Sequence, residues 1–146
     1  VRTASDNNAS VKQADIIVLS VKPQILKEVC ESLSSSLSHR PLIISIAAGI
    51  ELSSLNDWLG EAQAIVRCMP NTPAQVLKGA SGLMANPYVS DEQKDLSTEL
   101  FSGIGVVEWL SDESQMHSVT ALAGSGPAYI FMMIEAMESA AIKQGM

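Results

Sequence analysis

Three nearly uninterrupted apolar runs in the first half of the chain constrain its fold more than any other feature. They are DIIVLSV at 15–21, LIISIAAG at 42–49 and AIVRCM at 64–69, and each has the length of a β-strand. Apolar runs that do not alternate with polar residues predict strands buried on both faces, which is typical of a parallel sheet covered by helices. The sequence therefore predicts an α/β fold with a parallel sheet.

The segments between these runs have helical spacing. After the first run, the apolar residues at positions i, i+3, i+4 and i+7 are Leu26, Val29, Cys30 and Leu33. After the second run, a short helix is expected to end at Gly60, with the apolar positions Ile50, Leu52, Leu55, Trp58 and Leu59. The chain thus reads as strand, turn and helix, repeated.

The second half changes in character. KGASGLMANP at 78–87 predicts one or two short strands at the edge of the sheet. Ser90 and Gln93 form a capping-box pattern at the start of a helix. The apolar stripe of that helix is Leu96, Leu100, Phe101 and Ile104. VVEWL at 106–110 predicts a last strand, and everything after Ser111 is expected to be helical.

The charge and hydropathy of the chain limit the kinds of partner that it can bind. The formal net charge is −7 and no Lys/Arg cluster offsets it, which disfavours nucleic acid and anionic membrane surfaces. Residues 114–134 carry no formal charge, but GSGP and other polar residues favour a helix buried in protein over one in lipid. AYIFMMI at 128–134 is apolar on all sides and needs partners on several of them. The polar start of the chain indicates a cytoplasmic location.

The two cysteines do not suggest a site. Cys30 and Cys68 lie 38 residues apart without CxxC spacing, so neither a disulfide framework nor a metal site is predicted. Cys30 is on the apolar stripe of its helix and is expected in the core. No histidine close in sequence would activate Cys68, and His39 and His117 are expected in a loop and on a helix surface.

The candidate binding edge lies where the three predicted strands end. They end in SVKP at 20–23, SIAAG at 45–49 and CMPNTP at 68–73, and ligands of an open parallel sheet bind outside the carboxyl ends of the strands. Lys22 adds a positive charge beside a helix N-terminus, which favours anions. The fixed φ of Pro70 and Pro73 would hold Asn71 and Thr72 in one shape. The alternatives are a Lys-Pro turn and a stiff MPNTP turn, both without ligand contact.

Two glycine pairs do not form a dinucleotide fingerprint. Gly103-Ile-Gly105 precedes a predicted strand instead of following one, and Gly124-Ser-Gly126 lacks both a preceding strand and the third glycine. Gly103 is expected to stop a helix. The group GSGP at 124–127 predicts a break between helices, with close packing as its purpose.

Taken together, these motifs resemble the pyrroline-5-carboxylate reductase family. The matching segments occur in the family's order: DIIVLSVKP at 15–23, SIAAG at 45–49, IVRCMPNTP at 65–73, Gly79-Ala80, and AGSGPAY at 123–129. MPNTP followed some fifty residues later by GSGPAY is the most specific part of the pattern. The resemblance covers nearly the whole chain.

The resemblance implies a fold and an activity. The fold would be the C-terminal part of a Rossmann-type domain, residues 1–112, followed by the beginning of a helical dimerisation domain, residues 113–146. The activity would be hydride transfer from NADPH or NADH to the imine carbon of 1-pyrroline-5-carboxylate, giving L-proline, in a homodimer or higher homo-oligomer. The positions that correspond to cofactor contacts are Asn7, Val21, Lys22, Ala48 and Asn71. No catalytic residue is assigned, because the imine nitrogen is basic enough to arrive protonated.

The departures from the family pattern leave alternatives open. In the family, a first strand with a glycine-rich turn precedes the position of Val1, and further helices with a substrate-carboxylate loop follow the position of Met146. The chain therefore corresponds to the middle of such an enzyme. One alternative is an inactive chain that acts only as a dimerising module. Another is a related Rossmann-plus-helical dehydrogenase, such as those acting on β-hydroxy acids, although those enzymes usually carry a catalytic lysine that GSGPAY does not match.

Overall fold

The computed structural model describes residues 3–60 and 62–146, and within them five strands form one sheet with the order β1-β2-β3-β4-β5. The strands are β1 (Ile16–Leu19), β2 (Leu42–Ser45), β3 (Ala64–Met69), β4 (Gly79–Ala85) and β5 (Gly105–Trp109). The α-helices are α1 (Asn7–Val11), α2 (Pro23–Leu33), α3 (Leu52–Leu59), α4 (Asp91–Ser102), α5 (Gln115–Val119) and α6 (Gly126–Lys143). Three short elements complete the described part: the 3₁₀ turns η1 (Ser34–Ser36) and η2 (Thr72–Val76), and the π-helical turn η3 (Thr120–Gly124).

The sheet is mixed, which corrects part of the prediction. β1, β2 and β3 are parallel, as expected, but β4 runs antiparallel to β3, and β5 is parallel to β4. Residues 78–87 were expected at the sheet edge, yet β4 lies between β3 and β5. The antiparallel direction of β4 follows from the short connection 70–78, since a parallel crossover needs a dozen or more residues and usually a helix.

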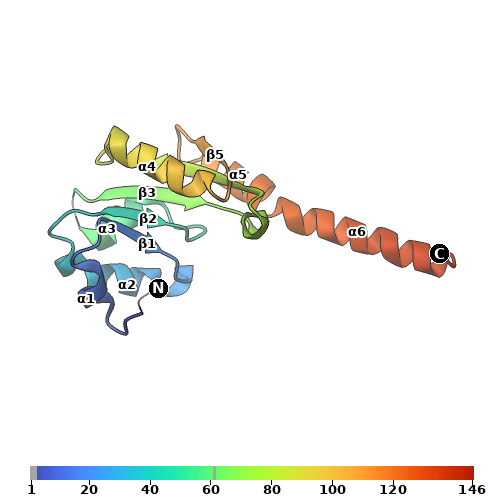
Figure 1. Cartoon of the computed structure of the whole chain (residues 1–146), viewed down its shortest axis with the longest axis horizontal. Helices are drawn as coiled ribbons and strands as arrows, with labels where there is room; N and C mark the ends of the chain where they lie inside the picture. The colour runs from blue at the N-terminus through green and yellow to red at the C-terminus, as the bar shows by residue number, and fades with distance from the viewer. Residues whose placement is uncertain (1–2, 61) are drawn as a thin grey trace.

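Helices cover both faces of the central strands, which confirms the burial predicted from the continuous apolar runs. Figure 1 shows α1, α2 and α3 on one side of the sheet and α4 on the other. The first core joins Ile17, Ile43 and Ile65 of the strands to α2 and α3. The second core joins the alternate strand positions, such as Ile44 and Val66, to Phe101 of α4.

The α4 side of β1 is less well covered. β1 has no neighbouring strand on its outer edge in the described structure, and Val18 is 45% exposed. Leu96 and Leu100 of α4 face the same region and are 42% and 47% exposed. The apolar stripe predicted for α4 is therefore buried at Phe101 but only partly covered at its two leucines.

Local signals at helix ends agree with the sequence. The side chain of Ser90 accepts from the Gln93 N–H while the side chain of Gln93 accepts from the Ser90 N–H, so the capping box is confirmed. Gly60 and Gly103 follow the last residues of α3 and α4, as predicted. These contacts satisfy amide groups that a helix terminus leaves without partners.

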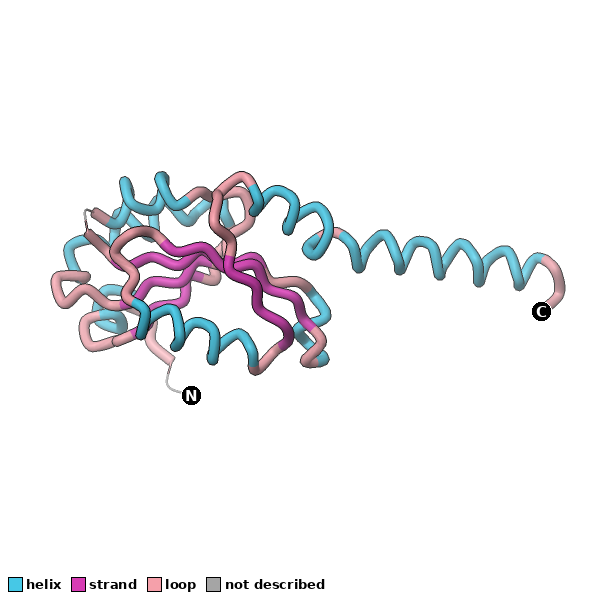
Figure 2. Tube along the Cα trace, turned by 90° about the horizontal axis from the view of Figure 1, so that it is seen from above, coloured by secondary structure: helices cyan, strands magenta, loops and turns pink. Residues whose placement is uncertain are grey.

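The helical C-terminal segment leaves the body of the molecule. In Figures 1 and 2, α6 projects away from the sheet. The stretch Gln115–Lys143 is long and apolar enough to cross a membrane by length and composition alone, and the apolar window within it is 0% buried. The expectation of a helix buried in protein is thus not met inside this chain. Phe131 and Ile134 are 64% and 54% exposed, which agrees with the predicted need for partners from outside.

One close approach in the sheet gives a direct test of the fold. Gly105 pairs with Gly79, and a Cβ at Gly105 would lie 2.0 Å from the Gly79 carbonyl oxygen. We expect Gly105→Ala to lower the free energy of unfolding by about 2 kcal/mol or more, because overpacking forces the backbone to shift. Gly126→Ala is the matched control, since a Cβ there meets no atom within 4 Å. Urea unfolding measures both variants, and equal losses would contradict the β4–β5 pairing.

Candidate functional site

The predicted binding edge exists because three adjacent strands are parallel and in register. Leu19, Ser45 and Arg67 are paired across β1, β2 and β3, so the loops after these strands leave the same edge of the sheet. This brings together the loops that carry Lys22, Ala48 and Asn71. Ligands of open α/β sheets bind at such an edge.

Lys22 and the start of α2 form a place suited to an anion. Lys22 is the N-cap residue, Pro23 follows it at the start of the helix, and no side chain caps the first turn. Pro23 has no N–H and the Ile25 N–H donates to the Lys22 carbonyl at 3.1 Å, so the Gln24 N–H is the first-turn donor that the described residues leave to a ligand. The helix dipole also favours negative charge there. Lys22 itself is exposed, and no acidic side chain within residues 3–60 and 62–146 forms a salt bridge with it.

Val21 and Ala48 occupy the neighbouring loops. Val21 packs partly against the core on the α2 side, whereas Ala48 is exposed. Gly49 follows Ala48 with φ of 76°, a conformation that glycine adopts without strain. A ligand can therefore approach the main chain closely at the end of β2.

An apolar hollow of about 380 Å³ lies next to this edge. Val18 and Ile46 form its floor, α4 forms one wall, and Pro70 and Asn71 of the MPNTP loop form another. Hollows of this size and apolar lining are typical of small-molecule and cofactor sites. The carboxyl edge thus combines a place for an anion with a place for a flat apolar ring.

The MPNTP loop is held by more than its prolines. Asn71 has an extended backbone and caps the 3₁₀ turn η2, in which Pro73 lies in the first turn. Its side-chain Oδ1 accepts from the Ala80 N–H at 2.9 Å, and its Nδ2 donates to the Ala123 carbonyl at 3.0 Å. The loop is therefore fixed to β4 and to the helical segment by one carboxamide.

An ion pair between a buried arginine and a partly exposed glutamate fixes the helical segment to the sheet nearby. Arg67 is 2% exposed in β3 and forms a salt bridge with Glu113, just before α5. Removing one partner of a buried pair leaves an uncompensated charge, which typically costs about 3–5 kcal/mol. No sequence motif predicted a role for Glu113, although a lone arginine in an apolar strand is a signal that some acidic partner must exist.

The predicted break at GSGP is a π-helical turn, Thr120–Gly124, that ends at the first glycine of the group and packs against Met69 of β3, while Gly126 and Pro127 begin α6. The Ser125 N–H donates to the Thr120 carbonyl, five residues earlier, at 2.9 Å. A Cβ at Gly124 would lie 2.8 Å from the methyl carbon of Met69, so close packing is confirmed for this glycine. Gly126 has no atom within 4 Å of such a Cβ, and close packing is not its purpose. π-Helical turns are rare in proteins as a whole, and many of those that occur lie at functional sites.

Asn7 lies apart from the other predicted site residues. Its neighbour Asn8 donates to the side chain of Ser32 and accepts from that of Ser36, both near the C-terminal end of α2. Lys22 precedes the N-terminal end of the same helix, roughly 15 Å away along its axis from Ser32. The structure thus brings Val21, Lys22, Ala48 and Asn71 to one edge and leaves Asn7 nearer the other end of α2.

The thiols and imidazoles do not form a reactive centre. Burial raises the pKa of Cys30 to about 11 and that of Cys68 to about 12, so both are protonated at neutral pH. His39 lies in a turn near the Ala14 carbonyl, and His117 is exposed on α5, as predicted. In the part of the chain that the structure describes, no group of three or more His, Cys, Asp or Glu side chains is arranged to hold a metal ion.

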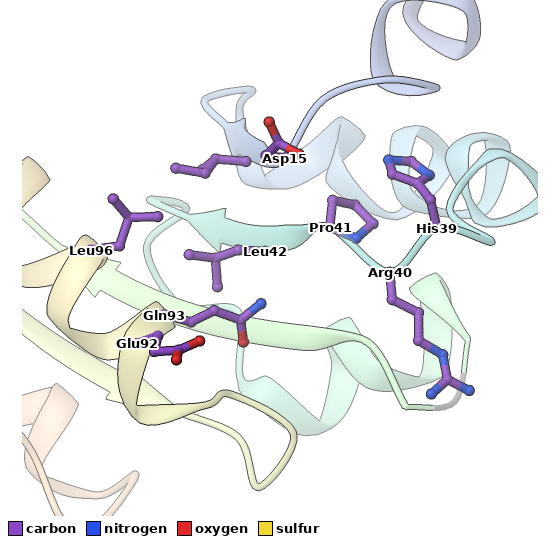
Figure 3. A pocket seen from close by; sticks show the side chains of 9 residues that line it. Asp15, His39, Arg40, Pro41, Leu42, Glu92, Gln93 and Leu96 are labelled. Atoms are coloured by element: carbon purple, nitrogen blue, oxygen red, sulfur yellow. The ribbon is translucent and has the colours of Figure 1, made fainter.

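A second hollow, of about 550 Å³, lies at the opposite edge of the sheet (Figure 3). Asp15 and Pro41 are at its rim just before β1 and β2, and Glu92 and Gln93 of α4 lie across from them. Because it lies at the amino ends of the strands, it is separate from the edge that carries Lys22 and Asn71.

Two family models match parts of the chain. Residues 113–146 match a model described as pyrroline-5-carboxylate reductase dimerisation. Residues 1–49 match a model described as NADP oxidoreductase coenzyme F420-dependent.

Individual relatives match over the whole chain. The pyrroline-5-carboxylate reductase of Pseudomonas aeruginosa is 49% identical over 146 residues, which is 100% of this chain and 54% of that protein. The solved pyrroline-5-carboxylate reductase of Coxiella burnetii has a TM-score of 0.92 at 46% identity, and the match covers 100% of this chain and 54% of that one. The pyrroline carboxylate reductase of Plasmodium falciparum, solved with NADP bound, has a TM-score of 0.92 at 34% identity, and the match covers 98% of this chain and 54% of that one. The chain spans about half the length of the relatives it matches.

Proposed function

This chain belongs to the pyrroline-5-carboxylate reductase family, and we propose that it forms the part of such an enzyme that holds the nicotinamide cofactor and begins the dimerisation domain. The reaction would transfer hydride from NADPH or NADH to the imine carbon of 1-pyrroline-5-carboxylate, giving L-proline. The observation that carries the proposal is the match along the entire chain, which includes both MPNTP and GSGPAY.

The proposed roles follow from the carboxyl edge of the sheet. A cofactor phosphate would lie at the N-terminus of α2 beside Lys22, where the Gln24 N–H, the helix dipole and one positive charge favour it. Val21 and Ala48 would contact the cofactor through the loops after β1 and β2. The hollow bounded by Pro70 and Asn71 would take the flat ring. Asn7, which lies nearer the other end of α2, would contact the far end of an extended cofactor.

The proposed reaction does not require a strong general acid or base from this chain. The cofactor supplies the hydride, and the imine carbon accepts it while the protonated imine nitrogen becomes an amine. We assign no catalytic residue and no metal ligand. What the chain contributes is position, because a rigid wall at the MPNTP loop restricts the orientations of two bound reactants.

The domain boundary and the assembly belong to the same proposal. Residues 1–112 would form the cofactor-binding part and residues 113–146 the start of the dimerisation domain, which is the range of the matching family model. The small-molecule imine, and neither nucleic acid nor a membrane, would be the ligand besides the cofactor. A cytoplasmic location fits this activity and remains an expectation from the sequence.

The experiment that tests the function is a chimera. Residues 1–146 replace the matched segment of the Pseudomonas aeruginosa reductase, which supplies the flanking parts. We expect the chimera to oxidise NADPH or NADH when 1-pyrroline-5-carboxylate is present and to form proline. A folded dimeric chimera without turnover would contradict the proposal and favour an inactive dimerising module. Turnover of β-hydroxy acids instead would favour a related dehydrogenase.

The role of Lys22 can be measured in the same chimera. We expect Lys22→Ala to weaken cofactor binding roughly 10- to 100-fold, because a hydrogen bond to a charged group contributes about 1.5–3 kcal/mol. Lys27→Ala is the matched control, since Lys27 lies on the same helix and pairs with Glu31 at 3.7 Å. Fluorescence titration gives the dissociation constants. Equal constants for Lys22→Ala and the parent would show that Lys22 is only a turn residue.

The exposed surface of α6 generates a prediction about assembly. Phe131, Met133 and Ile134 are 64%, 59% and 54% exposed, and burying each such side chain contributes about 1.5–3 kcal/mol. We expect the chain to form a homodimer or a higher homo-oligomer through residues 114–146, and Ile134→Asp to shift it toward monomer. Glu138→Gln, on the same helix, should leave the assembly unchanged. Sedimentation equilibrium over a range of concentrations measures the mass of the assembly. A monomer whose mass is unaffected by Ile134→Asp would contradict the prediction.

A further inference from the structure

The side chain of Asn71 joins three segments that are distant in the sequence. Its Oδ1 accepts from the Ala80 N–H of β4, and its Nδ2 donates to the Ala123 carbonyl of the π-helical turn. The second contact spans 52 residues and connects the MPNTP motif with the first residue of AGSGPAY at 123–129. Each end of the carboxamide therefore already has a backbone partner before any ligand is considered.

The Ala123 carbonyl needs a donor from outside its own helix. In an α-helix this carbonyl would accept from the N–H four residues later, and that residue is Pro127. Proline has no N–H, so the usual intrahelical partner does not exist. A partly buried carbonyl without a donor is costly, and the Nδ2 of Asn71 supplies the missing hydrogen bond at 3.0 Å.

Neighbouring contacts hold the same junction from the same side of the sheet. Arg67 and Met69 precede Asn71 at intervals of two residues, which places them on one face of the strand. Arg67 pairs with Glu113, and Met69 lies against Gly124. These two contacts seat the helical segment on the α2–α3 face of β3, whereas the hollow lies on the α4 face. Asn71 follows the end of the strand, so it contacts the helical segment and also lines the hollow together with Pro70.

We propose that Asn71 is a positioning residue that replaces the hydrogen-bond donor missing at Pro127 and thereby locks the wall of the ring-binding hollow to the helical segment. It acts through the geometry of the MPNTP loop and the π-helical turn. The wall that faces the reactants and the helices that lead to the partner subunit then move as one body. The proposal deepens the proposed function, and its kinetic test rests on that function.

Substitutions separate this role from direct contact with the cofactor. Asn71→Asp keeps an acceptor for the Ala80 N–H, but it replaces the donor to Ala123 by an oxygen that repels the carbonyl. Pro127→Ala returns an N–H to the position from which a helix would satisfy Ala123. If the missing donor is what matters, Pro127→Ala rescues Asn71→Asp. Restoring a donor at Pro127 would not rescue a lost cofactor contact.

Asn86 provides the matched control. It is a buried asparagine whose Oδ1 accepts from the Ile65 and Tyr88 N–H groups and whose Nδ2 donates to the Gln63 carbonyl and to Asn56. It does not line the hollow at the carboxyl edge. Asn86→Asp should therefore lower stability without changing the position of the helical segment.

The structural experiment uses the full 146-residue chain and does not depend on activity. Spin labels are attached at Lys27→Cys on α2 and Glu138→Cys on α6, and labelled chain is diluted with unlabelled chain to suppress distances between subunits. The natural Cys30 and Cys68 are buried with pKa values raised to about 11 and 12, so they react poorly with the label. We expect Asn71→Asp to broaden the distance distribution, Pro127→Ala to narrow it again, and Asn86→Asp to leave it unchanged.

The kinetic experiment uses the chimera described above. We expect Asn71→Asp to lower kcat roughly 10- to 100-fold with the cofactor dissociation constant within about twofold of the parent, because small misplacements of bound reactants reduce rates strongly. The double variant with Pro127→Ala should regain most of the lost kcat. Asn86→Asp should keep the kcat of the parent.

Each outcome decides for or against the positioning role. An unchanged distance distribution in Asn71→Asp, or no rescue by Pro127→Ala, overturns it. A weakened cofactor dissociation constant with normal kcat also overturns it and makes Asn71 a cofactor ligand. Should Asn71→Asp fail to fold, Asn71→Ala repeats the comparison without the added charge. If the parent chimera has no activity, the proposed function fails, and the distance measurement still decides the role of Asn71.

Discussion

The parallel pairing of β1, β2 and β3, of which β2 and β3 are buried on both faces, decides where the other elements of the molecule lie. Because these strands run in one direction and in register, their loops leave the same edge, and that edge is where an anion site and an apolar hollow can meet. Burial on both faces requires helices on both sides, and the crossover helices α2 and α3 meet this need on one side. The position of α2, whose N-terminus points to the edge, is thus a consequence of the sheet.

Arg67 shows how the sheet controls the segment that follows it. A guanidinium at 2% exposure in the middle of an apolar strand is tolerated only with a partner, and Glu113 is that partner. The ion pair therefore fixes the start of the helical segment against β3 instead of leaving it as a free extension. The same strand face then presents Met69 to Gly124, so the turn that directs α6 is placed by residues of the sheet. The helix that would meet a partner subunit begins from a defined point.

The sequence predicted local structure better than it predicted contacts. β3 has the predicted bounds of Ala64–Met69, and the Ser90–Gln93 capping box forms, because both depend on residues close in the chain. The prediction that residues 78–87 form strands at the sheet edge within a parallel sheet was wrong for β4. Composition does not say whether a strand pairs parallel or antiparallel, and the short connection after β3 decides this. The resemblance placed Asn71 at the cofactor, a role that stays a prediction, but the contacts of Asn71 with Ala80 and Ala123 were not foreseen. Partners from distant segments become visible only when the fold brings their backbones together.

Two prolines with different effects explain why MPNTP and GSGPAY belong to one structural unit. Pro73 acts by its fixed φ, which shapes the loop around Asn71, whereas Pro127 acts by the N–H that it lacks. The carbonyl left without a partner by the second proline is satisfied by the side chain that the first motif holds in place. A substitution in either motif is therefore felt in the other, although 52 residues separate Asn71 from Ala123.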